Sequence, residues 1–188
     1  MSKKVGILVG SLRKESFSRK IARALKTLAP AALVMEEVEI GELVMYNQDF
    51  DDEGVAPSSW SVFRERMKNM DAVLFITPEY NRSVPAVLKN ALDVGSRPYG
   101  QSVWDGKPGA VVSVSPGGLS GFGANHHLRQ SLVFLNIPAM QQPEAYIGHA
   151  ADLFDANGTL SNEKTHEFLQ KFMEEFAVWI ETNALKKS

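Results

Sequence analysis

Near the start of the chain runs the sequence VGILVGSLRKESFS, from Val5 to Ser18. Its five leading residues are almost all apolar and predict a buried strand, and apolar residues recur at helical spacing between Ile21 and Leu28. The segment between these two elements, Gly10 to Ser18, is therefore predicted to be a strand-to-helix turn.

This turn has the composition of a phosphate site. The start of a helix leaves unpaired backbone N–H groups, and the helix dipole favours negative charge there. Ser11, Ser16 and Ser18 add hydroxyl donors, and Arg13 adds a guanidinium. From these residues alone a second interpretation stays open, in which Ser16 or Ser18 only caps the helix and Arg13 is solvated.

Two better-known phosphate loops do not match. A P-loop needs four residues between its glycines, whereas Gly100 and Gly106 are separated by five and Lys107 is followed by Pro108. The dinucleotide fingerprint needs three glycines after the first strand, and only Gly10 is present. A hydroxyl-rich turn of this kind suits a phosphate monoester such as FMN.

Composition narrows the class of protein. With 188 residues, 44% of them hydrophobic, the chain is expected to form a single domain over residues 1–188. A net charge of −2 without a basic stripe argues against a nucleic-acid partner. Cysteine is absent, which excludes disulfides and thiolate chemistry and fits a reducing compartment. The apolar run near the N-terminus is too short for a signal peptide or membrane span, so we expect a cytoplasmic protein without a membrane partner.

Strand and helix patterns alternate five times along the chain. This alternation predicts an α/β fold with a doubly wound, five-stranded parallel sheet, and we expect the flavodoxin-like strand order 2-1-3-4-5. Three acidic residues in the second strand indicate an edge position. The aromatic loop from Gly41 to Gly54 is expected to be a lid or a subunit contact. The strands are expected at 5–9, 33–40, 72–76, 109–114 and within 137–146, and later helices are expected to begin near Pro57, at Pro85, before Leu128 and at Ser161.

In such a sheet, turns after neighbouring strands meet at one edge. The predicted crevice combines residues 10–18, 78–81 and 115–123, which follow strands 1, 3 and 4. They supply a phosphate cradle, an aromatic ring with an amide, and a glycine-rich floor. A flavin needs all three, because its ring must be stacked, its polar edge must face donors, and its N5 must stay open.

The same motifs carry a family resemblance. Gly10-Ser11-Leu12-Arg13, Pro78-Glu79-Tyr80-Asn81 and His127-Leu128-Arg129-Gln130 resemble the NADPH-dependent FMN reductase family, in particular its chromate and quinone reductase branch. The resemblance extends to about Glu144. We expect no catalytic side chain, because a flavin cycle needs no protein nucleophile, and no metal site. The resemblance implies that the cofactor-binding residues are Ser11, Arg13, Ser16, Phe17 and Ser18 at the FMN phosphate, Pro78, Glu79, Tyr80 and Asn81 at the ring, and Ser115, Pro116, Gly117 and Gly118 as further contacts.

The implied activity is an NAD(P)H oxidoreductase with ping-pong kinetics. NADPH or NADH delivers a hydride to bound FMN, which then reduces a quinone, a free flavin or a metal oxyanion such as chromate. A homodimer or homotetramer is expected. The alternative is a one-electron carrier resembling flavodoxin, although a net charge of −2 is a poor match to the acidic docking face of a carrier.

Several residues keep two interpretations. Glu79 either protonates a quinone or, as we favour, caps the third helix. His126 and His127 are adjacent and point apart, which favours a surface or interface role over metal binding. Arg129 and Glu144 form either an intersubunit pair or a solvated face. Tyr80 is either core filler or, as its turn suggests, a ring contact.

Overall fold

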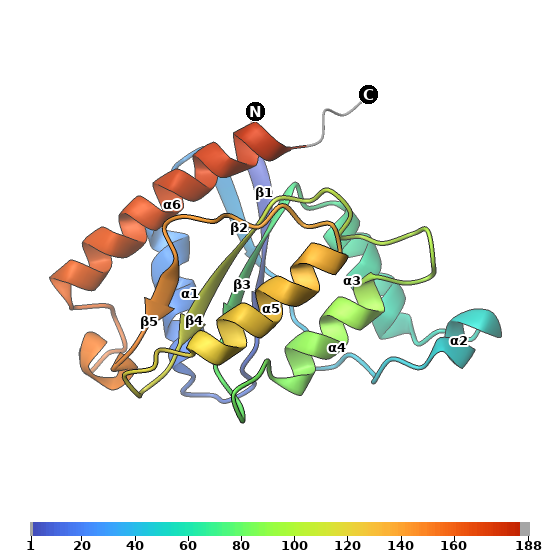
Figure 1. Cartoon of the computed structure of the whole chain (residues 1–188), viewed down its shortest axis with the longest axis horizontal. Helices are drawn as coiled ribbons and strands as arrows, with labels where there is room; N and C mark the ends of the chain where they lie inside the picture. The colour runs from blue at the N-terminus through green and yellow to red at the C-terminus, as the bar shows by residue number, and fades with distance from the viewer. Residues whose placement is uncertain (1, 185–188) are drawn as a thin grey trace.

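A computed structural model describes residues 2–184, in which five parallel strands form one sheet in the order β2-β1-β3-β4-β5 (Figure 1). The predicted fold class and strand order are confirmed. In chain order the elements are β1 (Lys3–Val9), α1 (Phe17–Leu28), β2 (Leu33–Glu37), α2 (Gln48–Asp52), α3 (Ser58–Lys68), β3 (Ala72–Thr77), α4 (Ala86–Gly95), β4 (Gly109–Val114), α5 (Phe122–Phe134), β5 (Ala145–Ile147), the 3₁₀ helix η1 (Ala150–Leu153) and α6 (Glu163–Asn183).

Helices cover both faces of the sheet, which explains the uninterrupted apolar sequences of β3 and β4. Helices α1 and α6 cover one face, where Leu25, Phe172 and Phe176 are buried. Helices α3, α4 and α5 cover the other, around Trp60 and Trp104. Each such side chain contributes roughly 1.5–3 kcal/mol when fully buried.

The acidic strand β2 lies at the edge of the sheet, as predicted. Its charges are neutralised from two helices, because Arg19 of α1 donates to Glu37 and Arg66 of α3 donates to Glu36, the latter at 2.6 Å. Strand β2 ends at Glu37 rather than at residue 40, where the chain turns toward the following loop.

The predicted boundaries of β5 and α6 are also wrong. Strand β5 has only three residues and lies at the far end of the predicted range, because prolines interrupt the segment before it. Helix α6 is capped by Asn162, whose Oδ1 accepts from the Thr165 N–H at 3.0 Å, and not by Ser161. Adjacent Ser and Asn residues are equally good caps, so the sequence could not choose between them. Helix α3 does begin near Pro57, as predicted, because Pro57 is its N-cap and lies just before the first turn.

Within residues 2–184, no helix has the combination of length and apolar sequence that crossing a membrane requires.

Candidate active site

Three turns lie together at the carboxyl ends of the neighbouring strands β1, β3 and β4. The Gly10 N–H donates to the Ile76 carbonyl at 2.8 Å, which joins the start of the first turn to the end of β3. A Cβ added at Gly10 would lie 3.3 Å from Pro78 Cδ and 3.2 Å from Leu88 Cδ2. Glycine at this position therefore lets the first turn approach the second closely.

The first turn presents hydrogen-bond donors that no described residue uses. Ser11 and Ser18 are 4% and 2% exposed, and within residues 2–184 their hydroxyls have no hydrogen-bond partner. The backbone N–H groups of Phe17 and Ser18 likewise have no acceptor there. A cluster of unused donors at the N-terminus of a helix fits an anionic ligand.

Ser16 and Arg13 complete this donor set. Ser16 Oγ accepts from the Arg19 N–H at 3.2 Å, so Ser16 caps α1, while its own O–H remains able to donate. Arg13 is exposed and forms no ion pair with another described residue. The capping interpretation is thus correct for Ser16, and it leaves the donors of the turn available to a phosphate monoester.

Phe17 contributes its backbone to the turn and its ring to packing. The ring stacks on Phe154 with centroids 6.3 Å apart, and the Lys20 ammonium lies 5.7 Å from both rings. These contacts hold the start of α1 against the segment that follows β5.

The second turn is a tight hairpin in a strained conformation. Tyr80 and Ser83 exchange two backbone hydrogen bonds, of 3.0 and 2.9 Å, around Asn81 and Arg82, whose φ angles are +51° and +64°. Non-glycine residues at positive φ cost of order 1–3 kcal/mol and persist where the surroundings hold them. Tyr80 is 49% exposed, so it is not core filler, and its ring is available at the surface of the crevice.

The third turn brings backbone donors to the same edge. Ser115 Oγ accepts from the Gly117 N–H at 3.1 Å, whereas the N–H of Gly118 has no acceptor within residues 2–184. This turn packs against the residues after β5, since a Cβ at Gly148 would lie 2.4 Å from Ser120 Oγ. The sequence did not reveal the role of Gly148, because the short strand before it was poorly defined.

Glu79 caps a helix, although not the one predicted. Its Oε2 accepts from the Ala124 N–H of α5 at 3.1 Å, and its Oε1 accepts from Arg82 Nη1 at 3.0 Å. The predicted partner was the third helix of the alternating pattern, which begins after Pro85. Tertiary packing places the first turn of α5 closer to this carboxylate, because β4 lies beside β3.

The two adjacent histidines make separate contacts. His126 Nε2 lies 2.9 Å from Tyr146 Oη, which also donates to Glu144 at 2.8 Å, and His127 Nδ1 lies 3.0 Å from Ser83 Oγ. Burial, and then the hydrogen bond to Glu144, raise the pKa of Tyr146 to about 12. Within residues 2–184, no group of three His, Asp or Glu side chains is placed to hold a metal ion.

Arg129 and Glu144 have partners inside the chain. Arg129 donates to Asn125 Oδ1 and to the Met140 carbonyl, both at 2.9 Å, while Glu144 accepts from Tyr146. The surroundings of the two side chains therefore give no support to an intersubunit pair between them.

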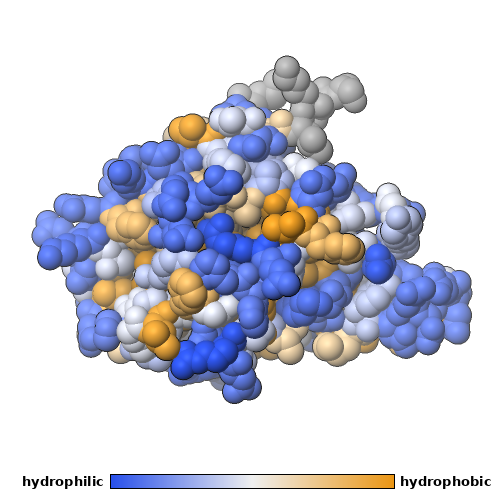
Figure 2. All heavy atoms as spheres, in the orientation of Figure 1, coloured by the Kyte–Doolittle hydropathy of each residue, from blue (hydrophilic) through white to orange (hydrophobic). Residues whose placement is uncertain are grey.

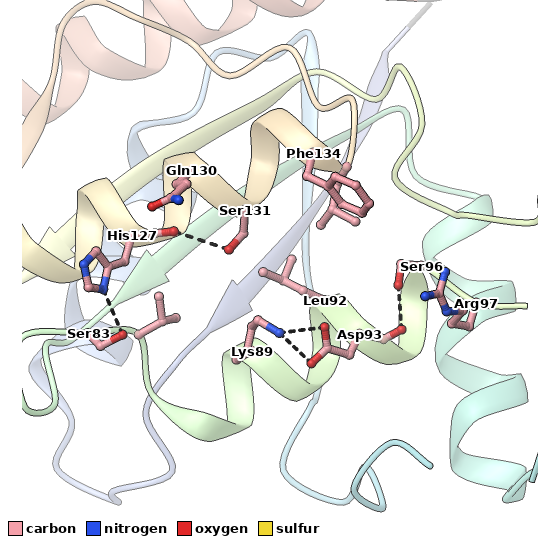
Figure 3. Close-up of a pocket in the computed structure, with 12 residues that line it drawn as sticks. Ser83, Lys89, Leu92, Asp93, Ser96, Arg97, His127, Gln130, Ser131 and Phe134 are labelled. Carbon is pink, nitrogen blue, oxygen red and sulfur yellow. Dashed lines mark hydrogen bonds and ion pairs between the residues drawn. The ribbon is translucent and has the colours of Figure 1, made fainter. Parts of the chain in front are cut away.

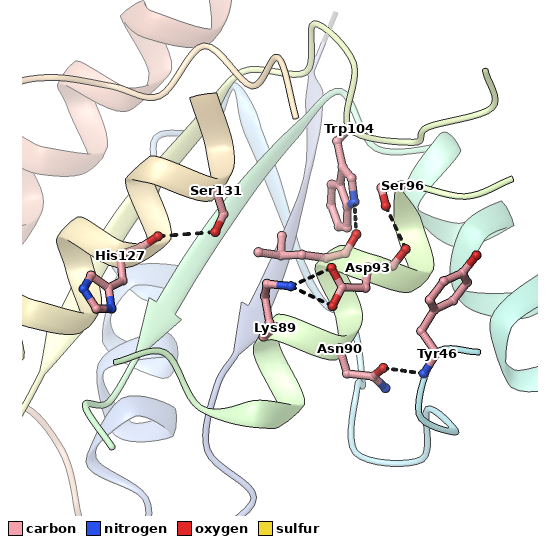
Figure 4. A network of polar contacts seen from close by, with 9 residues as sticks. Tyr46, Lys89, Asn90, Asp93, Ser96, Trp104, His127 and Ser131 are labelled. Atoms are coloured by element: carbon pink, nitrogen blue, oxygen red, sulfur yellow. Dashed lines mark hydrogen bonds and ion pairs between the residues drawn. The ribbon is translucent and has the colours of Figure 1, made fainter. Parts of the chain in front are cut away.

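The loop from Gly41 to Gly54 is packed against the body of the protein and contains the unpredicted helix α2. Tyr46 stacks on Trp60 with centroids 5.2 Å apart, and Phe50 lies 5.8 Å from the same ring. Buried Asn90 holds the loop by accepting from the Tyr46 N–H at 2.8 Å (Figure 4). The Tyr46 and Phe50 rings are therefore packed within the chain, on the Trp60 ring.

A groove of about 570 Å³ runs between α4 and α5, beside the second turn. Figure 3 shows Ser83 and His127 at one end and Phe134 and Ser96 at the other. Phe134 is 88% exposed, and apolar atoms gather over this end of α5 in Figure 2. The groove was not predicted, because it depends on how closely the side chains of α4 and α5 pack against each other, and the sequence does not show this.

Known proteins resemble this chain over most of its length. The sequence model of the NADPH-dependent FMN reductase family matches residues 3–152. A quinone reductase from Pseudomonas putida is 63% identical over 179 residues, which cover 95% of each chain. A 2-hydroxy-1,4-benzoquinone reductase from a Burkholderia species is 46% identical over 180 residues, or 96% of this chain and 97% of that protein. The solved structure of the NAD(P)H:(acceptor) oxidoreductase FerB from Paracoccus denitrificans has a TM-score of 0.91 and 43% identity, and covers 97% of this chain and 100% of that one.

Proposed function

The chain belongs to the NADPH-dependent FMN reductase family, and from that premise we propose that quinones are its principal acceptors and that it works by ping-pong kinetics. It is an FMN-dependent NAD(P)H oxidoreductase. The acceptor proposal is carried by one observation, the exposed apolar side chains on all three turns. They are Leu12, Tyr80, Leu119 and Phe122, each between 49% and 63% exposed.

FMN, when bound, supplies a ring nitrogen that takes a hydride from NAD(P)H and passes the electrons on. We propose a single FMN domain over residues 1–188, located in the cytoplasm. The unused donors of the first turn would hold the phosphate, with Arg13 adding a charge from the solvent side. The proposed phosphate contacts are Ser11, Arg13, Ser16, Phe17 and Ser18, and the proposed ring contacts are Pro78, Glu79, Tyr80, Asn81, Ser115, Pro116, Gly117 and Gly118.

The protein side chains bind and orient the flavin and its reaction partners, and no protein nucleophile is needed. The unpaired N–H of Gly118 would face the polar edge of the ring, where a donor stabilises negative charge. The exposed ring of Tyr80 offers a face for a flat partner. With room for one flat partner at a time, the donor must leave before the acceptor enters.

Free flavins and chromate are further proposed acceptors. Exposed apolar side chains on all three turns offer a face for many flat acceptors without an array of charged groups that would select one substrate. Arg82, whose side chain is 71% exposed beside Glu79, provides positive charge that attracts an oxyanion.

An anaerobic titration distinguishes an NAD(P)H-dependent reductase from a one-electron carrier. NADPH should bleach the flavin absorption of the holoprotein, and a benzoquinone added next should restore it. Initial rates with NADPH and the quinone should give parallel double-reciprocal lines. If NADPH leaves the spectrum unchanged while a separate reductase bleaches it, the protein is an electron carrier.

We also propose that the chain forms a homodimer, or a homotetramer built from dimers, through the α4–α5 face. A projecting Phe134 beside a groove of about 570 Å³ offers a knob and a hole on one surface, as a two-fold interface requires. This location replaces the Gly41–Gly54 loop, whose Tyr46 and Phe50 rings are packed within the chain.

A further inference from the structure

We infer that Glu79 is a positioning residue that clamps the Tyr80–Ser83 turn to the first turn of α5, and that Gly123 is the helix position that makes this contact possible. The inference rests on the proposed function, in which the flavin ring lies against that turn. It also decides between the two interpretations of Glu79, as proton donor or as cap.

Both carboxylate oxygens of Glu79 already accept hydrogen bonds. Oε1 faces the Arg82 guanidinium at 3.0 Å and Oε2 faces the Ala124 N–H at 3.1 Å, and the side chain is only 11% exposed. An ionised carboxylate accepts at both oxygens, whereas a protonated one must donate at one of them. Both neighbours are themselves donors, so both oxygens of Glu79 serve as acceptors that join the turn to α5.

Gly123 supports the clamp from the helix side. Glycine inside a helix is disfavoured relative to alanine, so its presence in α5 calls for a packing reason. A Cβ there would lie 2.9 Å from Glu79 Oε2 and 2.9 Å from the Arg82 carbonyl oxygen. Backbone and carboxylate of the turn thus occupy the space that any other side chain would need.

A third contact lies one helical turn further along α5. His127 Nδ1 lies 3.0 Å from Ser83 Oγ, as the dashed line in Figure 3 marks. Within the turn the local contacts are the Tyr80–Ser83 backbone pair and the Glu79–Arg82 ion pair, and its two central residues are at positive φ. Contacts with α5 at both ends of the turn therefore supply the restraint that its strained conformation needs.

The first test compares Glu79→Gln with Glu79→Ala. Glutamine keeps an oxygen for the Ala124 N–H, and the exposed Arg82 can turn away, whereas alanine removes the clamp. We expect the Tyr80 and Ser83 amides of the full-length protein to exchange hydrogen about tenfold faster in Glu79→Ala and at the wild-type rate in Glu79→Gln. The FMN dissociation constant should rise about tenfold in Glu79→Ala, which corresponds to about 1.4 kcal/mol.

Turnover separates positioning from proton donation. At saturating FMN, Glu79→Gln should keep the shape of the wild-type pH profile of quinone turnover, whatever its rate, since the side chain supplies no proton in this role. A Glu79→Gln variant that exchanges normally but changes the shape of this pH profile would overturn the inference in favour of a catalytic acid.

The second test adds a methyl group at the helix. Gly123→Ala should quicken exchange at Tyr80 and Ser83 and weaken FMN binding, despite the better helix propensity of alanine. The control is Thr182→Ala in an exposed turn of α6, on the opposite face of the sheet, which should change neither quantity. Unchanged exchange in Gly123→Ala overturns the clamp, and if this variant does not fold, Glu79→Ala decides.

The clamp by Glu79 and the placement of the flavin ring against this turn can be refuted independently. Faster exchange in Glu79→Ala with an unchanged FMN dissociation constant supports the clamp and refutes the placement of the ring against this turn.

Discussion

At the scale of single residues, we propose that Arg13 contributes to FMN binding without contributing to folding. It has no ion pair within residues 2–184, and it lies in the turn with the unused donors of Ser11 and Ser18. We expect Arg13→Ala to remove a charge-assisted phosphate contact of roughly 1.5–3 kcal/mol and to raise the FMN dissociation constant about 10- to 100-fold. Quenching of flavin fluorescence on titration with apoprotein measures this constant.

The matched control is Lys14→Ala, the neighbouring exposed cation. It should have a much smaller effect on FMN binding, because its charge acts without a directed hydrogen bond. Neither variant should change the melting temperature of the FMN-free protein. An equal loss of FMN affinity in the two variants would mean that Arg13 acts only through its positive charge and not through a directed hydrogen bond.

Among the elements, the segment that contains α2 differs most from the expectation of a lid or a subunit contact. Asp51 forms two 2.8 Å bonds with the Arg64 guanidinium, and Arg64 Nε donates to the Val94 carbonyl at 2.9 Å. The pair is buried, with side chains 7% and 11% exposed, and it ties α2, α3 and α4 together. This segment is therefore a structural strap rather than a freely moving lid.

Removing one partner of this buried pair should be costly. We expect Arg64→Met to lower the free energy of unfolding by about 3–5 kcal/mol, because Asp51 is left as an uncompensated buried charge. Urea unfolding followed by circular dichroism measures the loss.

Arg66→Met, on the same helix, is the control for the Arg64 substitution. Arg66 pairs with Glu36 at 2.6 Å, but both side chains are about 40% exposed, at 39% and 42%. Exposed pairs contribute about 0–1 kcal/mol, so this variant should remain close to wild type. A loss of similar size in both variants would contradict the assignment of the strap.

For the molecule as a whole, we predict that the Phe134 ring is part of the interface between subunits. The ring is 88% exposed at one end of the α4–α5 groove. Burying it against a second copy would contribute roughly 1.5–3 kcal/mol. Light scattering at micromolar concentration should show a dimer or tetramer for the wild-type protein and a smaller species for Phe134→Glu.

Val178→Glu tests whether any new surface charge has the same effect. Val178 is 62% exposed on α6, which covers the opposite face of the sheet. This variant should keep the wild-type mass. A monomeric wild-type protein would contradict the proposed interface directly.

Periodicity accounts for most of what could be predicted of the elements. Strands β3 and β4 are apolar without interruption and helix α3 repeats Trp60, Phe63 and Met67 on one face, so their locations follow from burial alone. Strand β5 and helix α2 are short and carry no clear period. Their conformation depends on neighbours, namely β4 for the strand and the Asp51–Arg64 pair for the helix.

The amino-acid sequence by itself determines which chemical groups the proposed site contains: the serines and Arg13 of the first turn, the Pro-Glu-Tyr-Asn motif and the glycine-rich third turn. Local rules suffice there, since a turn between a strand and a helix has free N–H groups wherever it occurs. Only the tertiary structure decides that Glu79 caps α5, that Tyr46 packs on Trp60 and that Phe134 borders a groove. These contacts join residues far apart in the chain, so their distances follow from how helices pack across the sheet, which no local pattern encodes.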